Sequence, residues 1–515
     1  MRRFALALIA TLSFLALPSL SAPSAFADEG FVALFDGQSL AGWTSPDMSW
    51  WSVEDGAITA RSTAEKPCKS NQFLAWGLGE MDDFELKLRF RLSGHASANS
   101  GVQFRSAIQA DGHAVGYQAD IDLAGQWLGA LYDEHTDRRM LAKRGERTLI
   151  DPQGKRTVQA LDGGGAKPPA AGPDGWSEYH ISARGTRLTL RINGEVTAEV
   201  VDDERAQRDL SGRLALQLHS GPATTVQFKD IRLKRLPLAP VEGVERKRLV
   251  MVAGAPSHGP GEHEFNAGVA LLRRCLQQGA PQVLAVAIHD AGWPKDPTAF
   301  DNADGVVLYM DGGKRHPIAG RLPEVRKLME RGVGLMCMHF AVEVEDEPSR
   351  AAFKEWIGGH YEAGYSSNPH WEASLTPHPT HPITRGVKAS AVQDEWYFCM
   401  RFRGDEDSIT PLLRATPTDK TREMNGWPRA SYPHIQAMKG RSETLMWAIE
   451  RADGGRGVGF TGGHWHRNWA LEDNRKAVLN AMVWVARAEV PQDGVASRVT
   501  DEQMTQGLDP KPRRK

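Results

Sequence analysis

Cysteine is scarce in this sequence, and its scarcity excludes one class of exported protein. Only 4 of the 515 residues are Cys, whereas small disulfide-stapled scaffolds are dense in cysteine. Cys275 lies in an amphipathic helical run and Cys337 in a hydrophobic strand-like run, so we expect both to be buried thiols. The fold should therefore depend on hydrophobic cores and not on disulfides.

A surplus of charge of either sign is also lacking. Lys and Arg total 62 and Asp and Glu total 64, so no overall field favours nucleic acid or an anionic membrane surface. Beyond the N-terminus no segment is apolar enough to span a membrane. We expect neither a nucleic-acid partner nor an integral membrane segment, and the sequence leaves the oligomeric state open.

The one long apolar run stands at the N-terminus. Arg2 and Arg3 precede an apolar stretch from Phe4 to Leu17, and Ala25-Phe-Ala27 is a small-x-small cleavage motif. The alternative is a membrane anchor, but the stretch is shorter than the roughly 20 residues of a span. We predict a signal peptide over residues 1–27 and export to the periplasm or the extracellular space.

The length suggests two or three domains, and the sequence pattern changes once along the chain. Up to about Arg235, short alternating runs such as 84–92 and 188–192 are separated by turn residues, among them Asn193-Gly194. Alternation with a period of two and an Asn-Gly hairpin signal predict an antiparallel, two-layer β-sandwich over residues 28–236.

After a linker at 237–247 the pattern becomes that of an α/β domain. Buried strand-like runs, the first at 248–254, alternate with amphipathic helical runs, the first at 265–278. This alternation predicts parallel βαβ units, so we expect a doubly wound sheet over residues 248–490. The last segment, 491–515, loses periodicity and is expected to be disordered.

Histidines and acids follow four of the strands expected in this sheet. A single such histidine is more often structural, but parallel strands place their carboxyl ends on one edge, so these side chains should converge. Neutral imidazole ligates metals or carries protons near pH 7, yet the spacing matches neither a zinc finger nor a His-Glu-x-x-His helix. The imidazoles make a divalent metal ion a candidate cofactor, although their spacing alone does not indicate one. We predict metal ligands at His258, His263, His339 and His464, catalytic roles for His258, His339 and Glu343, and substrate contacts at Asp311 and His466.

Four motifs in this half carry a family resemblance: Ala255-Pro-Ser-His-Gly-Pro-Gly-Glu-His-Glu-Phe265, Met338-His-Phe-Ala-Val-Glu343, Asp394-Glu-Trp-Tyr397 and Gly454-Gly-Arg-Gly-Val-Gly-Phe-Thr-Gly-Gly-His464. Together they resemble the trehalose-utilisation (ThuA-like) family. The resemblance implies a flavodoxin-like fold similar to class I glutamine amidotransferases, which carry a nucleophilic Cys on the sharp turn after a strand. Here His339 stands near that turn, Cys337 lies inside the strand, and nothing in the sequence marks an exposed elbow. This departure argues against amidotransferase chemistry.

In the first half, polar residues occupy every second position of three strand-like runs. Their apolar neighbours, such as Val102 and Leu216, should face the core between the sheets. Amides, acids and a histidine suit hydroxyl-rich ligands, although polar residues on an outer sheet face are often only solvated. We predict catalytic roles for Asp120 and His219, and sugar contacts at Arg105, Gln118, Asp122, Gln217, Trp127 and Tyr132.

A second resemblance rests on motifs of this half: Phe31-Val-Ala-Leu-Phe-Asp-Gly-Gln-Ser-Leu-Ala-Gly-Trp43, Trp51-Ser-Val-Glu-Asp-Gly56, Ala98-Asn-Ser-Gly-Val102, Gly116-Tyr-Gln-Ala-Asp120, Gly129-Ala-Leu-Tyr132 and Leu216-Gln-Leu-His-Ser-Gly221. They look like the 3-keto-disaccharide hydrolase family, which implies a concanavalin-like jelly-roll sandwich. Many relatives have Glu where this chain has Gln118, so Asp120 or Asp122 would have to serve instead.

This resemblance implies cleavage of the glycosidic bond of a sugar oxidised at carbon 3, so an oligosaccharide or glycoside is the expected substrate. Loss of the acidified proton at carbon 2 expels the leaving group at carbon 1, and addition of water completes a net hydrolysis; the route needs one base and one electrophile. Three hypotheses remain: a hydrolase or lyase with catalysis in one domain or both, a non-catalytic carbohydrate-binding sandwich that serves a sugar-processing α/β domain, and a secreted adhesion protein. The predicted crevice argues against the third.

Overall fold

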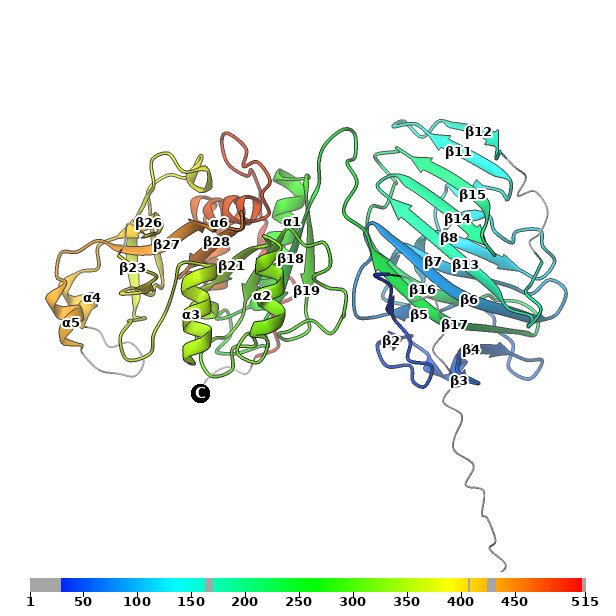
Figure 1. The fold of residues 1–515 in the computed structure, drawn as a ribbon, viewed down its shortest axis with the longest axis horizontal. Coiled ribbons are helices and arrows are strands. Elements are labelled where there is room, and N and C mark those ends of the chain that lie inside the picture. Colours follow the sequence, from blue (N-terminus) through cyan, green and yellow to red (C-terminus); the bar gives the residue numbers. More distant parts are fainter. Residues whose placement is uncertain (1–28, 163–169, 406–407, 424–431, 512–515) are drawn as a thin grey trace, which may run out of the picture.

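The structure is a computed structural model that describes residues 29–162, 170–405, 408–423 and 432–511. A β-sandwich and an α/β domain lie side by side (Figure 1). The predicted signal peptide lies outside the described residues. Among the described residues, no helix is both long and apolar enough to cross a membrane.

The sandwich consists of two β-sheets that enclose one hydrophobic core. Along β6 the side chains of Phe84, Leu86 and Leu88 are buried in this core, whereas the residues between them are half-buried on the outer face, as alternation predicts. The ten-stranded sheet contains β1 (Val32–Ala33), β3 (Trp51–Glu54), β4 (Ala57–Ser62), β6 (Phe84–Gly94), β11 (Glu146–Ile150), β12 (Arg156–Ala160), β13 (Ser177–Arg184), β14 (Arg187–Ile192), β15 (Glu195–Asp202) and β17 (Thr224–Arg235). The seven-stranded sheet contains β2 (Trp43–Thr44), β5 (Gln72–Trp76), β7 (Asn99–Ile108), β8 (Ala114–Asp122), β9 (Leu131–Glu134), β10 (Arg139–Ala142) and β16 (Arg213–Leu218).

The α/β domain is built on a nine-stranded sheet with the order β19-β18-β20-β21-β28-β27-β26-β23-β24. The first five strands in this order are parallel, as predicted, and the other four extend the sheet with antiparallel pairs. The strands are β18 (Lys247–Ala253), β19 (Val283–Ile288), β20 (Gly305–Tyr309), β21 (Gly334–Met338), β23 (His370–Pro377), β24 (Ser390–Glu395), β26 (Thr410–Ala415), β27 (Glu443–Glu450) and β28 (Arg456–Phe460), with a separate pair of β22 (Gly359–His360) and β25 (Arg401–Phe402).

Helices cover both faces of this sheet. The cores show the division, because α1 and α6 pack on one face and α2 and α3 on the other. The α-helices are α1 (Phe265–Gly279), α2 (Leu322–Glu330), α3 (Glu347–Trp356), α4 (Asp419–Glu423), α5 (Pro433–Ala437), α6 (Glu472–Val485) and α7 (Asp501–Thr505). The 3-10 turns are η1 (Met48–Trp50), η2 (His339–Val342), η3 (Pro382–Thr384) and η5 (His466–Ala470). All four cysteines are free and buried, which confirms the burial predicted for Cys275 and Cys337.

Buried ion pairs join the two domains across the chain segment that links them. Arg248 Nε of the α/β domain lies 2.7 Å from Asp82 Oδ2 of the sandwich, and both side chains are at most 2% exposed. Arg235 at the end of the sandwich pairs with Asp296 of the α/β domain at 2.8 Å. Charges that are buried this deeply must stay paired, so the contact between the domains is specific.

The segment after residue 490 differs from the expected disordered tail. It contains α7, which begins with a capping box between Thr500 and Gln503. Lys511 then enters the α/β domain, where its ammonium lies 3.3 Å from the buried Glu264 carboxylate. Long-range pairing of this kind is invisible to local periodicity, which is why the sequence predicted disorder.

Candidate active site

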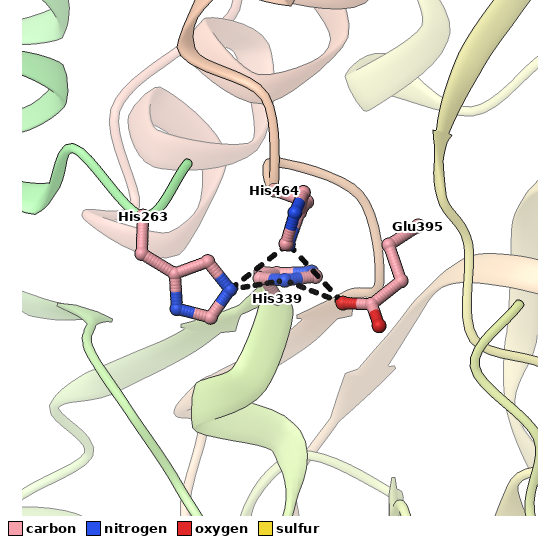
Figure 2. A group of neighbouring side chains, drawn as sticks. All are labelled: His263, His339, Glu395 and His464. Atoms are coloured by element: carbon pink, nitrogen blue, oxygen red, sulfur yellow. Dashed lines mark hydrogen bonds and ion pairs between the residues drawn. The ribbon is translucent and has the colours of Figure 1, made fainter. Parts of the chain in front are cut away.

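Three histidines and one glutamate converge at the carboxyl edge of the parallel strands (Figure 2). Each offers one ligand atom, and these four atoms all lie within 4.8 Å of one another. His263 Nε2 lies 3.0 Å from His464 Nδ1 and 3.1 Å from His339 Nε2. Glu395 Oε2 lies 3.4 Å from His339 Nε2 and 3.2 Å from His464 Nδ1. We call these four residues the His/Glu cluster.

An unusual backbone conformation delivers two of the histidines. His339 follows β21 directly with a φ of +54°, and His263, in the loop after β18, has a φ of +46°. Such left-handed conformations are strained for residues with a side chain and persist only where the surroundings impose them. The sharp turn that the sequence did not reveal is thus present and holds His339. Cys337 stays buried within β21, where burial raises the pKa of its thiol, so thiolate chemistry is disfavoured as expected.

Hydrogen bonds on the outer ring nitrogens decide which nitrogens face the centre of the cluster. His339 Nδ1 donates to the Thr461 carbonyl at 3.0 Å, and His263 Nδ1 donates to Asp311 Oδ1 at 2.9 Å. Their Nε2 atoms therefore both present lone pairs, which repel at 3.1 Å unless a proton or a cation lies between them. Two nitrogens bound to one metal at about 2.1 Å are about 3.0 to 3.4 Å apart for right-angled to tetrahedral geometry. The spacing fits a divalent cation.

The charges of the cluster balance one another. Burial raises the pKa of Glu395, but hydrogen bonds to His339 and His464 and their charges outweigh burial and lower it far below its usual range. Burial lowers the pKa of His339, but the bond to Glu395 and its charge outweigh burial and raise it. Burial and the neighbouring imidazoles hold the pKa of His263 well below 6.5. A cation bound by the cluster would compete with protons for these nitrogen and carboxylate atoms.

The cluster opens on a cavity of about 540 Å³ whose wall includes Glu343. Burial and the negative charges of Glu345 and Glu395 raise the pKa of Glu343 to about 7. A carboxyl group with such a pKa exchanges its proton near neutral pH, as a general acid or base does. Gly312 shapes the cavity floor, because a Cβ there would collide with the carbonyl oxygens of Phe340 and Glu343.

Two further residues predicted for this edge lie beside the cluster, and one does not. The ring of His258 stacks on His263 with 3.6 Å between centroids, and these two form a second donor group with Asp311. Asp311 thus orients His263 and borders the site. His466 begins the turn η5, and its Nε2 donates to the Met504 carbonyl at 3.1 Å. The structure therefore does not bring His466 to the substrate cavity.

A second pocket, of about 430 Å³, lies on the seven-stranded sheet of the sandwich. Alternation along β8 places Tyr117 and Ala119 in the core and leaves the residues between them for the opposite face. Five of the residues predicted there line the pocket: Gln118, Asp120, Trp127, Tyr132 and His219.

A chain of hydrogen bonds organises this sandwich pocket. Gln103 Nε2 donates to Gln118 Oε1, and Gln118 Nε2 donates to Asp120 Oδ1, both at 2.7 Å. Burial and the charge of Glu134 raise the pKa of Asp120 well above its usual value, although the hydrogen bond from Gln118 lowers it. The raised pKa makes Asp120 a candidate proton carrier in this pocket.

Three of the predicted sugar contacts have other roles. Arg105 lies at a β-bulge in β7 with a φ of +48°, so alternation fails there and its guanidinium turns inward to Asp83 Oδ1 at 2.8 Å. Asp122 accepts hydrogen bonds from the main-chain N–H groups of residues 126–128, which shapes the loop that carries Trp127. Gln217 is fully buried in β16 and does not line the pocket.

Comparison with known families accounts for both halves of the chain. Residues 30–234 match the 3-keto-alpha-glucoside-1,2-lyase-like domain, and residues 250–485 match the trehalose-utilisation (ThuA) family. The chain joins one domain of each family. Both resemblances expected from the motifs are confirmed, and the protein is a sugar-processing protein. No curated protein matches the chain.

Solved structures resemble each domain separately. A protein assigned to the glycosyl hydrolases from Parabacteroides distasonis is 17% identical, with 40% of this chain and 94% of that chain covered and a TM-score of 0.27. The carbohydrate-binding module CBM66 from Bacillus subtilis is 18% identical over 38% of this chain and 95% of that chain, with a TM-score of 0.26. A ThuA-like protein from Parabacteroides merdae is 15% identical over 51% of this chain and 100% of that chain, with a TM-score of 0.36.

The sequence prediction missed the carboxylate of the ThuA-domain cluster and one acid of the lyase-like domain. Glu395 belongs to a motif that carries the family resemblance, but it ends the antiparallel strand β24. A rule that considers only the ends of parallel strands therefore does not predict it as a site residue. Glu134 lines the sandwich pocket on β9, two residues after Tyr132. Alternation alone could have found Glu134.

Proposed function

We propose that this protein is an exported enzyme that cleaves the glycosidic bond of 3-keto-glycosides and that its ThuA domain holds the reaction centre. The observation that carries the proposal is the His/Glu cluster, which shares one cavity with Glu343. The match of the sandwich to the 3-keto-alpha-glucoside-1,2-lyase-like domain supplies the substrate class.

The chemistry follows from the ketone. A carbonyl at carbon 3 acidifies the hydrogen at carbon 2, so a base can remove it as a proton. The electron pair then forms a double bond between carbons 1 and 2, and the bond from carbon 1 to the leaving oxygen breaks as that oxygen takes a proton. Water adds across the double bond and completes a net hydrolysis. This route needs a base, an acid and positive charge near the ketone oxygen, and not the paired carboxylates of ordinary glycosidases.

Two side chains of the cavity suit the proton transfers. Glu343, with a pKa of about 7, is sufficiently deprotonated at neutral pH to take the proton from carbon 2. His258 borders the same cavity with a third of its side chain exposed, and burial lowers its pKa although the charge of Asp311, 4.0 Å away, opposes this shift. We assign His258 to the leaving oxygen.

The cluster residues fit a divalent cation. They offer three imidazole nitrogens and one carboxylate oxygen, all of them atom types that bind divalent cations such as zinc in proteins. Asp311 and the Thr461 carbonyl hold the rings of His263 and His339 from outside, as partners of metal-bound imidazoles commonly do. Bound there, a cation supplies positive charge for a carbonyl oxygen or a water molecule.

The sandwich pocket is a second candidate centre for the same reaction, which the raised pKa of Asp120 favours. Under the main proposal this pocket only binds sugar, with Trp127, 36% exposed at its rim, as a stacking surface. Under the second proposal Asp120 takes the proton from carbon 2.

One experiment separates the two centres. The full chain without its signal segment, Glu395→Gln and Asp120→Asn are each supplied with 3-keto-trehalose and with trehalose, and products are followed by mass spectrometry. We expect the unmodified protein to cleave the 3-keto sugar alone, Glu395→Gln to lose that activity and Asp120→Asn to keep it. Loss of activity in Asp120→Asn alone would assign the reaction to the sandwich. If the unmodified protein cleaves neither sugar, the proposal is wrong.

Export has its own test. The Arg2-Arg3 start, the apolar run and the Ala25-Phe-Ala27 motif support it. We expect the mature protein in its host to begin at Asp28, as mass spectrometry of the N-terminal peptide would show. A cytoplasmic protein that keeps Met1 would overturn it.

A further inference from the structure

The C-terminal segment from Asp501 to Lys511, which we call the C-terminal strap, contacts the loop that carries His263. Lys511 Nζ donates to the carbonyl oxygens of Glu262 and His263, the latter at 3.1 Å, and lies 3.3 Å from Glu264 Oε1. The Lys511 side chain is 4% exposed and that of Glu264 is 1% exposed. The three N–H donors of the ammonium thus meet three acceptors within the sequence Glu262-His263-Glu264, and the Asp509 carboxylate lies 3.9 Å away.

From these contacts we propose that Lys511 is a positioning residue of the candidate metal centre. His263 stands in the left-handed region, so its loop needs outside contacts to keep that conformation. The ammonium binds the carbonyl oxygens of Glu262 and His263, one on each side of the His263 Cα, and so fixes the two peptide planes that set the direction of its ring. The cluster therefore depends on a residue 248 positions away in the sequence.

The strap and the loop are linked at more than one point. The Glu264 carboxylate accepts hydrogen bonds from Gly261 N at 2.9 Å and from Asp509 N at 2.8 Å. Asn266 Nδ2 donates to Asp509 Oδ1 at 3.0 Å. Glu264 is thus the joint between the strap and the loop, and Lys511 neutralises its buried charge.

The effect should fall first on one ligand of the four, His263, whose main-chain N–H in turn donates to the His464 carbonyl at 2.9 Å. His339 and His464 follow β21 and β28, which lie side by side in the centre of the sheet, and Glu395 ends β24. His263 alone lies on the loop segment to which Lys511 is bonded. Loss of the ammonium should loosen this histidine and leave three donors in place, which weakens metal binding without abolishing it.

The test uses Co²⁺ titration of the full chain, followed by visible absorption. This inference rests on the proposed metal centre. Lys511→Met should bind Co²⁺ about 10 to 100 times more weakly, the range known for outer-shell partners, with an altered Co²⁺ spectrum that reports a changed ligand set. Lys439→Met is the matched control, because its ammonium, 48% exposed, pairs with surface acids.

A double variant guards against misfolding. Lys511→Met with Glu264→Gln removes both charges of the closest pair, and the Asp509 carboxylate, 3.9 Å from Lys511, keeps its hydrogen bond from Asn266, so the variant should fold and still bind Co²⁺ weakly. Unchanged affinity and spectrum in Lys511→Met or in the double variant overturn the positioning role alone. Failure of the unmodified protein to bind Co²⁺ overturns the metal centre and this role together.

Discussion

In the sandwich, Gln118, Asp120 and Tyr132 stand on the faces of neighbouring strands, whereas the three histidines of the ThuA-domain cluster come from segments that follow strands. Gln118 and Asp120 alternate with core residues along β8, and a ladder of hydrogen bonds fixes their spacing. His263 and His339 instead occupy strained backbone positions outside the ladder. A sheet face presents rows of polar groups suited to a sugar, while convergent loops can aim several imidazoles at one point.

The difference extends to electrostatics. One buried carboxyl group, Asp120, dominates the sandwich pocket, and burial pushes its pKa upward. The ThuA cavity combines a strongly acidic Glu395 with a weakly acidic Glu343, because imidazoles surround the first, whereas burial and neighbouring carboxylates raise the pKa of the second. Two acids with separated pKa values suit a division of roles, and our proposal assigns them as metal ligand and proton carrier.

Removal of a cluster imidazole should produce the largest effect. We expect His339→Ala to lower kcat/KM for a 3-keto-α-glucoside by about 10³-fold, within the range of lost acid–base and electrostatic catalysis, and to abolish tight metal binding. The exposed His289→Ala is the control. Steady-state kinetics and circular dichroism together check the result, and a folded His339→Ala enzyme of normal activity would assign the reaction to the sandwich.

Next in size is the loss of an ion pair between the domains. Asp82→Ala leaves Arg248 buried without its carboxylate, which should cost about 3 to 5 kcal/mol of unfolding free energy. Calorimetry should show one cooperative transition at a lower temperature. Glu54→Ala, which removes an exposed pair with Arg61, should change little. Two transitions in the unmodified protein, with only one shifted by Asp82→Ala, would show that the sandwich and the ThuA domain unfold independently.

Glu343→Gln should lower kcat/KM by about 10²-fold, because it removes the proton carrier and leaves the cluster intact. As a base, Glu343 must be ionised, so kcat/KM of the unmodified enzyme should fall as the pH drops below about 7. The negative charge of Glu345 helps to raise the pKa of Glu343. Glu345→Gln should therefore move this limb of the pH profile to lower pH. A limb that persists in Glu343→Gln would exclude this role.

The smallest effect is expected at the rim of the sandwich pocket. Trp127→Ala removes a stacking surface of about 0.5 to 1.5 kcal/mol, so KM should rise about 2- to 12-fold with kcat unchanged. Leu123→Ala, at an exposed position that does not line the pocket, is the matched control. A fall in kcat in Trp127→Ala would indicate that the sandwich takes part in the chemistry itself.

Local pattern was a good guide where neighbours in sequence are neighbours in space. Alternation placed Gln118 and Asp120 on one face of β8, and strand-end logic brought His263, His339 and His464 together. The same rules failed at a bulge and at an antiparallel strand. Arg105 turned inward because one extra residue reversed the alternation, and Glu395 reached the cluster from β24.

The sequence by itself determined the two fold classes, the polarity of the sheet faces and the three histidines of the cluster, because hydrophobic period and strand order are local or topological properties. Tertiary structure alone decided the fourth donor, the pKa of Glu343 and the pairing of Lys511 with the His263 loop. Each of these depends on groups that lie far apart in the chain. Burial and charge act through space, and their effects appear only when folding brings those groups within a few ångströms.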